Sequence, residues 1–123
     1  MVGTKTGKIS PAKFCVAMTR RILVLPEAEY DIEDIYNYIA ETNHDRAMQF
    51  FDAARQTFAE LARIPGLGQI YISDEDDISD LYRWFIKGFR NHLIFYRFSN
   101  EILTIVRVID GRRDLQSILE DFL

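Results

Sequence analysis

The sequence of 123 residues has few of the residues that build disulfides, metal sites and membrane spans. Cys15 is the only cysteine, which excludes an internal disulfide and a zinc site made from several cysteines. His44 and His92 have no metal-ligand companion at helical or strand spacing. No apolar run approaches the roughly 18 residues that a membrane-spanning helix needs. We therefore expect a soluble cytoplasmic protein with no metal, no cofactor and no membrane contact.

Catalytic motifs are also scarce. No serine lies in a nucleophile-elbow context and no glycine-rich loop could hold a phosphate, because GLG at 66–68 is typical of a helix stop. His44 falls at a turn, and His92 falls among apolar neighbours as a core or edge histidine would. The acids at 74–77 belong to a charged loop and lack the buried surroundings that separate a general acid from a base. The sequence favours a protein that is not an enzyme.

The chain is long enough for one domain and too short for two. Its first 17 residues carry Lys5, Lys8 and Lys13 and lack the apolar core of a secretory signal. We expect residues 1–18 to be a disordered extension and residues 19–123 to form the domain. Met18 leaves a misplaced start as an alternative, and a basic docking arm is another.

Apolar periodicity predicts an α+β fold. A strand over 21–25 runs into Pro26 and an amphipathic helix over 27–41, and Thr42 or Asn43 can cap a second helix that ends at Pro65. Strands over 81–87, 89–98 and 102–109 have short breaks, so they should form an antiparallel meander, and helical spacing returns over 113–123. The two helices should form a hairpin. We expect it to be purely structural, because its second helix has an apolar stripe at core spacing: Ala47, Phe50, Phe51, Ala54, Phe58 and Leu61.

Charge is distributed unevenly. The stretch 27–41 holds six acids and no lysine or arginine, whereas 83–113 holds seven basic residues against two acids, a net charge of +5. Strand alternation puts Leu81, Arg83, Phe85 and Lys87 on one side and Tyr82, Trp84 and Ile86 on the other, which predicts one core face and one charged face. The basic side could hold a nucleic-acid backbone, an acidic partner or the protein's own carboxylates. A pI near 5.1 disfavours nucleic-acid binding as the main role.

The segment IVRVIDGRRD, residues 105–114, carries the sharpest hypothesis. Alternation puts Arg107 on the face of Ile105 and Ile109, so it should either pair with a carboxylate such as Asp110 or Asp114 or be exposed in a site. We expect Arg107 and at least one of Arg112 and Arg113 to form an exposed functional edge, with Asp114 holding the turn after Gly111. The candidate binding residues are Arg83, Lys87, Arg90, Arg107, Asp110, Arg112 and Arg113.

The order of elements resembles the ParE branch of the RelE/ParE superfamily of type II toxin-antitoxin toxins. The resemblance runs from about Thr19 to the C-terminus and is carried by ILVLPEAEYDIEDIYNYIAE, AMQFFDAARQTFAELARIPGLG, LYRWFIKGFRNHLIFYRF and RVIDGRRD. It implies a helical hairpin on a small antiparallel sheet, a bacterial origin and a cognate antitoxin that neutralises the toxin.

The resemblance also implies a target. ParE-like toxins poison DNA gyrase, whereas RelE-like relatives cleave messenger RNA on the ribosome with basic residues and often a late tyrosine. This sequence has no tyrosine after Tyr96, and Asp110 stands where many relatives carry histidine. The expected function is therefore growth inhibition through gyrase, without direct sequence-specific nucleic-acid binding. The alternatives are a ribosome-dependent nuclease and an inactive antitoxin-binding member. We expect an acidic, amphipathic antitoxin segment on the basic side of the sheet.

Overall fold

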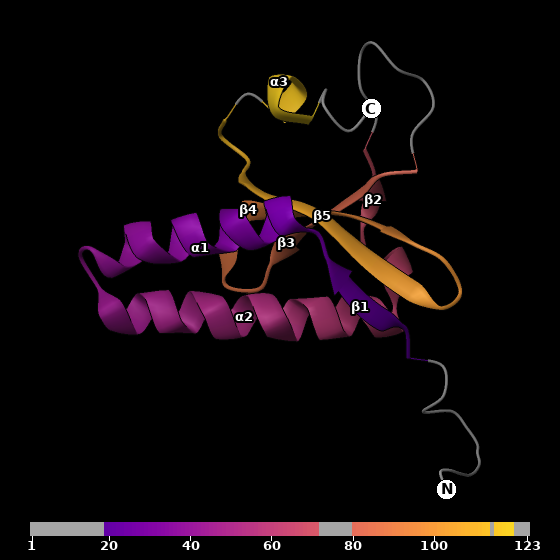
Figure 1. Ribbon diagram of the computed structural model, residues 1–123, viewed down its shortest axis with the longest axis horizontal. Helices are drawn as coiled ribbons and strands as arrows, with labels where there is room; N and C mark the ends of the chain where they lie inside the picture. The colour runs from indigo at the N-terminus through magenta and orange to yellow at the C-terminus, as the bar shows by residue number, and fades with distance from the viewer. Residues whose placement is uncertain (1–18, 72–79, 114, 120–123) are drawn as a thin grey trace, which may run out of the picture.

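A computed structural model describes residues 19–71, 80–113 and 115–119 of the protein. Two helices pack on one face of a mixed five-stranded sheet, and a short helix lies over the other face (Figure 1). The elements are β1 (Arg21–Val24), α1 (Pro26–Ala40), α2 (His44–Arg63), the 3-10 turn η2 (Pro65–Leu67), β2 (Gln69–Ile70), β3 (Tyr82–Ile86), β4 (Phe89–Phe98), β5 (Ile102–Asp110) and α3 (Leu115–Leu119). The α+β class, the hairpin, the meander and the closing helix are confirmed.

The sheet has the order β1-β5-β4-β3-β2. The meander β3-β4-β5 is antiparallel, and the short β2 extends it beyond β3. The sequence did not indicate β2 or the place of β1, which pairs in parallel with β5 from Arg21↔Ile102 to Val24↔Ile105. This parallel pairing places the start of α1 beside the second half of β5.

The helix boundaries follow from local chemistry. Pro26 occupies the first position of α1, where a backbone N–H would have had no partner within the helix. Glu27 and Glu29 lie in the first turn, where their negative charges interact favourably with the positive end of the helix dipole. The side chain of Asn43 caps α2 by accepting a hydrogen bond of 2.9 Å from the Arg46 amide. The helix ends before Pro65, which cannot continue it. Of the two residues that could cap this helix, Thr42 and Asn43, Asn43 is the cap.

The main core lies between the hairpin and the sheet. Phe50 and Leu61 of α2 meet Ile94 and Tyr96 of β4 and Ile105 of β5, and all five are fully buried. Ala28, Ala54 and Ala62 are the small residues of this core. Burial of these side chains contributes about 25 cal/mol for each Å² of apolar surface removed from water. The core therefore fixes the inner faces of α1 and α2 and leaves their outer faces free.

A second, smaller core lies on the opposite face of the sheet. Leu81, Phe95, Val106, Ile109 and Leu119 are buried there, with Leu115 and Ile118 of α3 packed against them. The expectation of one core face and one charged face was therefore wrong, because α3 covers part of the second face. Arg83 and Lys87 are nevertheless exposed.

A bulge in β5 overturns the simple alternation expected for residues 105–109. Tyr96 pairs with Ile105 but Phe95 pairs with Arg107, which leaves Val106 as an extra residue. As a result Ile105 and Val108 enter the main core, whereas Val106 and Ile109 enter the second core. The extension 1–18, the acids at 74–77, Asp114 and Phe122 lie outside the described residues, so the expectations for them stay predictions.

Candidate protein-docking site on the helical hairpin

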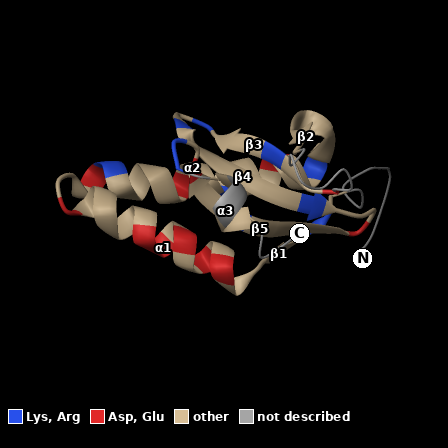
Figure 2. Cartoon of the chain, turned by 90° about the horizontal axis from the view of Figure 1, so that it is seen from above, with Lys and Arg blue, Asp and Glu red and all other residues tan. Residues whose placement is uncertain are grey.

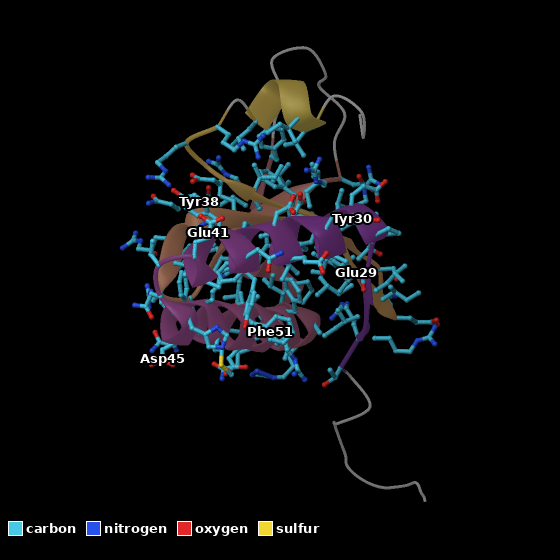
Figure 3. The ribbon with its side chains drawn as sticks, turned by 60° about the vertical axis from the view of Figure 1, so that its left-hand side comes forward. Glu29, Tyr30, Tyr38, Glu41, Asp45 and Phe51 are labelled. Atoms are coloured by element: carbon cyan, nitrogen blue, oxygen red, sulfur yellow. The ribbon has the colours of Figure 1, made fainter. Side chains whose placement is uncertain are left out.

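An open groove runs along the outer side of the hairpin, between α1 and α2, and reaches β1. Its volume is about 1430 Å³. Four large apolar side chains in it are substantially exposed: Ile22 (41%), Tyr30 (68%), Met48 (50%) and Phe51 (42%). Figure 3 shows Tyr30 and Phe51 on this side of the two helices. Exposed apolar side chains gathered in one groove are typical of a surface that binds another protein.

Phe51 explains why the groove could not be predicted from the sequence. It follows the buried Phe50 directly, and one residue turns the side chain by about 100° around a helix, away from the sheet. Its ring meets Tyr36 edge-on at 6.4 Å and lies 5.9 Å from the Arg55 guanidinium. The expectation that Phe51 belongs to the core was therefore wrong. The width of the apolar stripe on α2, greater than one packed face needs, was the available signal.

The rim of the groove is acidic. Glu29 and Glu33 line it on α1, Asp52 and Arg55 line it on α2, and the uncharged polar residues Asn37 and Gln56 complete the rim. Figure 2 shows that the acids follow α1, whereas basic residues lie on the strands and at the β3-β4 turn. The unequal charge seen in the sequence thus becomes two surfaces of opposite sign.

Five of the seven candidate binding residues lie at one end of the sheet: Lys87, Arg90, Asp110, Arg112 and Arg113. Lys87 and Arg90 flank Gly88, whose φ of 84° suits a tight turn, and both side chains are exposed. Arg112 and Arg113 follow the end of β5, where the Gly111 amide donates to the Asn91 carbonyl at 2.6 Å. Arg83 is exposed further along β3, opposite Phe95 of β4. We call Arg83, Lys87, Arg90, Arg112 and Arg113 the basic set.

Arg107 does not belong to that exposed set. Its Nε and Nη2 donate to the two carboxylate oxygens of Asp31 on α1 at 2.6 and 2.7 Å, and its side chain is only 19% exposed. Asp31 also accepts from the Val108 amide at 3.0 Å. Because β1 ends at Val24, that amide would otherwise lie at an open strand edge. Among the described residues, Asp31 rather than Asp110 is the carboxylate that pairs with Arg107, so the exposed role expected for Arg107 is corrected, whereas the expectation for Asp114 stays a prediction.

Asp110 pairs with Arg112 instead. The Arg112 Nη2 lies 2.5 Å from Asp110 Oδ2, and the Arg112 Nε lies 2.9 Å from Oδ1. The hydrogen bonds from this guanidinium lower the pKa of Asp110 to about 2, against a smaller opposing effect of burial. A carboxylate that holds its proton so weakly is a poor general base near neutral pH.

His92 and Tyr96 make contacts that hold the fold together. The His92 ring lies 5.4 Å from Phe50 and 6.4 Å from Phe89, and its buried Nδ1 has no hydrogen-bond partner among the described residues. Burial lowers the pKa of His92, with Asp110 raising it and Arg112 lowering it further. The Tyr96 hydroxyl donates to the Pro65 carbonyl at 2.6 Å and accepts from the Gly68 amide at 3.0 Å, which ties η2 to β4. Tyr96 is fully buried and cannot meet a substrate there.

Metal and membrane features are absent from the part of the chain that the structure describes. No three histidine, cysteine or acidic side chains gather there as a metal site would require. None of the described helices combines the length and apolar character needed to cross a membrane.

A small α+β domain with an open apolar groove on its hairpin and basic residues on its sheet is typical of a protein that docks other proteins. The chain belongs to the ParE toxin family, since the model described as "ParE toxin of type II toxin-antitoxin system, parDE" matches residues 22–115. A solved chain of the "Chromosomal ParDE TA system from P. aeruginosa" has the same fold, with a TM-score of 0.61 and 12% identity. The likeness covers 76% of this chain and 97% of that one. No curated protein matches the sequence.

Proposed function

We propose that this protein is a toxin that inhibits bacterial growth by acting on DNA gyrase in the cytoplasm, and that a cognate antitoxin neutralises it. The observation that carries the proposal is the family match over residues 22–115, which contains both helices of the groove and, apart from Arg21, every residue of the five strands. The proposal assigns the two surfaces to different partners. The groove takes the antitoxin, and the basic set contacts the target.

The groove supports the first assignment. An amphipathic segment binds by inserting apolar anchors into a hydrophobic groove, and this groove offers Ile22, Tyr30, Met48 and Phe51 for that purpose. From the sequence alone we expect the antitoxin on the basic side of the sheet. On that side, Leu115 and Ile118 of α3 pack against the buried cluster of Leu81, Phe95, Val106 and Ile109, so these apolar side chains are already covered. We therefore move the antitoxin to the hairpin.

The choice of gyrase over messenger RNA is supported by the state of the residues that a nuclease would use. Arg107 is engaged by Asp31, and Asp110 is a weak base paired with Arg112. The last tyrosine of the sequence, Tyr96, is buried under η2. A ribosome-dependent nuclease therefore stays the second candidate, and an inactive antitoxin-binding member the third.

The deciding experiment follows the first event after the toxin is induced in cells that lack antitoxin. Gyrase poisoning predicts DNA-damage signalling before protein synthesis stops. Translation arrest first, with codon-dependent cuts when purified toxin is mixed with ribosomes and messenger RNA, would assign the chain to the nuclease branch. Normal growth despite accumulation of folded toxin would favour the inactive member.

A further inference from the structure

We propose that the segment docked in the hairpin groove is an amphipathic helix with lysine or arginine along the flank that faces α1, where Glu29 and Glu33 lie. This inference rests on the proposed function, because the helix would belong to the antitoxin. It gives the docked segment basic flanking residues, in contrast to the acidic segment that the basic side of the sheet had suggested.

The geometry of the groove suits a helix. Glu29, Glu33 and Asn37 are spaced by four residues along α1 and all line the groove, so they form one row that runs along the helix at a shallow angle to its axis. Successive members of such a row are about 6 Å apart along the axis. A docked helix with basic residues at i and i+4 has the same spacing. It can therefore meet Glu29 and Glu33 together while its apolar stripe faces Phe51 and Met48.

The negative charges of the rim are only partly compensated in the described part of the chain. Neither Glu29, Glu33 nor Asp52 takes part in an ion pair among those residues. Asp31, on the same helix, points toward the sheet and forms an ion pair with Arg107. Arg55 is the single basic residue in the groove lining and lies beside the Phe51 ring. Three acids and one base leave the groove with a net negative charge that a basic flank would neutralise.

Charge of this kind acts mainly on encounter and on partner choice. Like charges brought together at an interface oppose binding, so a row of glutamates on the partner would be repelled by Glu29 and Glu33. The apolar anchors give affinity without distinguishing between amphipathic partners of different charge. The acidic row on α1 is thus the feature that selects among such partners.

Two synthetic amphipathic peptides of about 20 residues test the proposal, a length that allows several helical turns. Both carry the same apolar positions, with lysine on the flanks of one and glutamate on the flanks of the other. The full-length toxin should bind the lysine peptide at least about tenfold more tightly at low salt, and the preference should shrink as salt is added. Equal or tighter binding of the glutamate peptide would overturn the proposal.

The location is tested with two matched double variants. Glu29→Lys with Glu33→Lys should abolish or reverse the preference, whereas Glu27→Lys with Asp34→Lys, on the same helix but outside the groove lining, should keep it. The charge change is identical in both, so an equal loss would indicate only the general field of the protein and would count against the proposal. A thermal melt of each variant verifies that it is folded.

Two other occupants would each refute the inference. Tighter lysine-peptide binding by a chain starting at Met18 would make residues 1–17 the occupant of the groove. Self-association of the toxin that Met48→Lys abolishes would make a second copy the occupant. Growth arrest on induction is scored separately, so the toxin assignment can stand when the peptide preference fails, and the reverse.

Discussion

Asp31 joins the first helix to the sheet through a single carboxylate. It accepts two hydrogen bonds from Arg107 and one from the Val108 amide, and its side chain is only 14% exposed. A paired charge in such a place contributes little compared with a well-packed apolar pair, but removing one partner leaves the other charge poorly solvated. Removal of either Asp31 or Arg107 alone should therefore destabilise the contact between α1 and the sheet.

We predict that Arg107→Ala destabilises the protein by roughly 2–4 kcal/mol, somewhat less than for a fully buried pair because both side chains keep some contact with water. Urea unfolding measures this change. The exposed Arg112 is the matched control, and Arg112→Ala should lower the unfolding midpoint far less, because its ion pair with Asp110 is largely open to water. Equal midpoints for all three proteins would show that the Asp31 pair does not hold the helix on the sheet.

His92 should make stability depend on pH in the weakly acidic range. Burial lowers its pKa below the ordinary value of 6.5, so the unfolded chain takes up a proton before the folded chain does. Stability should be complete above about pH 7 and should fall as the pH drops through about 6.5. Asp110 affects stability only at lower pH. Because its pKa in the folded protein is about 2, its contribution to stability is preserved until the pH falls below about 4.

Thermal melts from about pH 7.5 to about pH 5 test this expectation, a range that brackets the usual pKa of histidine. His92→Phe removes the titrating group and keeps an aromatic ring beside Phe50 and Phe89, so its melting temperature should vary less over that range. His44→Gln removes the exposed histidine at the start of α2 and should retain the wild-type dependence. A dependence carried by His44 would contradict the assignment.

At the scale of the elements, α2 has two phenylalanines with different roles. Phe58 is 5% exposed and belongs to the main core, whereas Phe51 is 42% exposed and lies in the groove. Phe58→Ala should cost roughly 3–5 kcal/mol of stability, the usual range for a buried ring. Phe51→Ala should cost far less, but it should weaken binding of the groove partner because it removes an apolar anchor.

Urea unfolding and peptide titration of both variants separate the two roles. A near-neutral Phe58→Ala would mean that its side of the stripe faces a partner as well. A severe loss of stability in Phe51→Ala would return Phe51 to the core and remove an apolar anchor from the groove.

The sequence was sufficient for the elements that depend on local patterns. Periodicity and punctuation located α1, α2 and the three strands of the meander, because Pro26, Asn43, Pro65 and Gly88 act through their own backbone or nearest neighbours. It was insufficient where a distant segment decides. The bulge at Val106, the cover that α3 gives to Leu81, and the Asp31–Arg107 pair all depend on residues far apart in the chain.

The candidate site divides in the same way. The composition of the basic set and the acids of α1 could be read directly, and their separation on two surfaces is visible in Figure 2. Which side of α2 is buried could not be read, because a stripe containing both Phe50 and Phe51 is wider than one contact needs. The groove therefore needed the packed structure.

The whole molecule carries opposite charges on two surfaces, and in the proposed function each surface meets a different partner. The net charge of −4 conceals it, since α1 holds five acids and no lysine or arginine, whereas residues 83–113 hold seven basic residues and two acids. Electrostatic attraction over such patches speeds association and aligns the partners before contact. Loss of the basic patch should therefore impair action on the target and spare antitoxin binding.

Arg83→Ala combined with Arg90→Ala tests this separation. Both side chains are exposed, so the melting temperature should barely change. Most surface substitutions change the free energy of unfolding by less than about 0.5 kcal/mol. Growth inhibition in cells without antitoxin should be lost, while binding of the groove peptide should be retained. The control is Arg21→Ala with Arg63→Ala, which removes two exposed arginines outside the basic set and should stay toxic. Full toxicity of the Arg83/Arg90 variant, or loss of toxicity together with a lowered melting temperature, would rule out the basic set as the target surface.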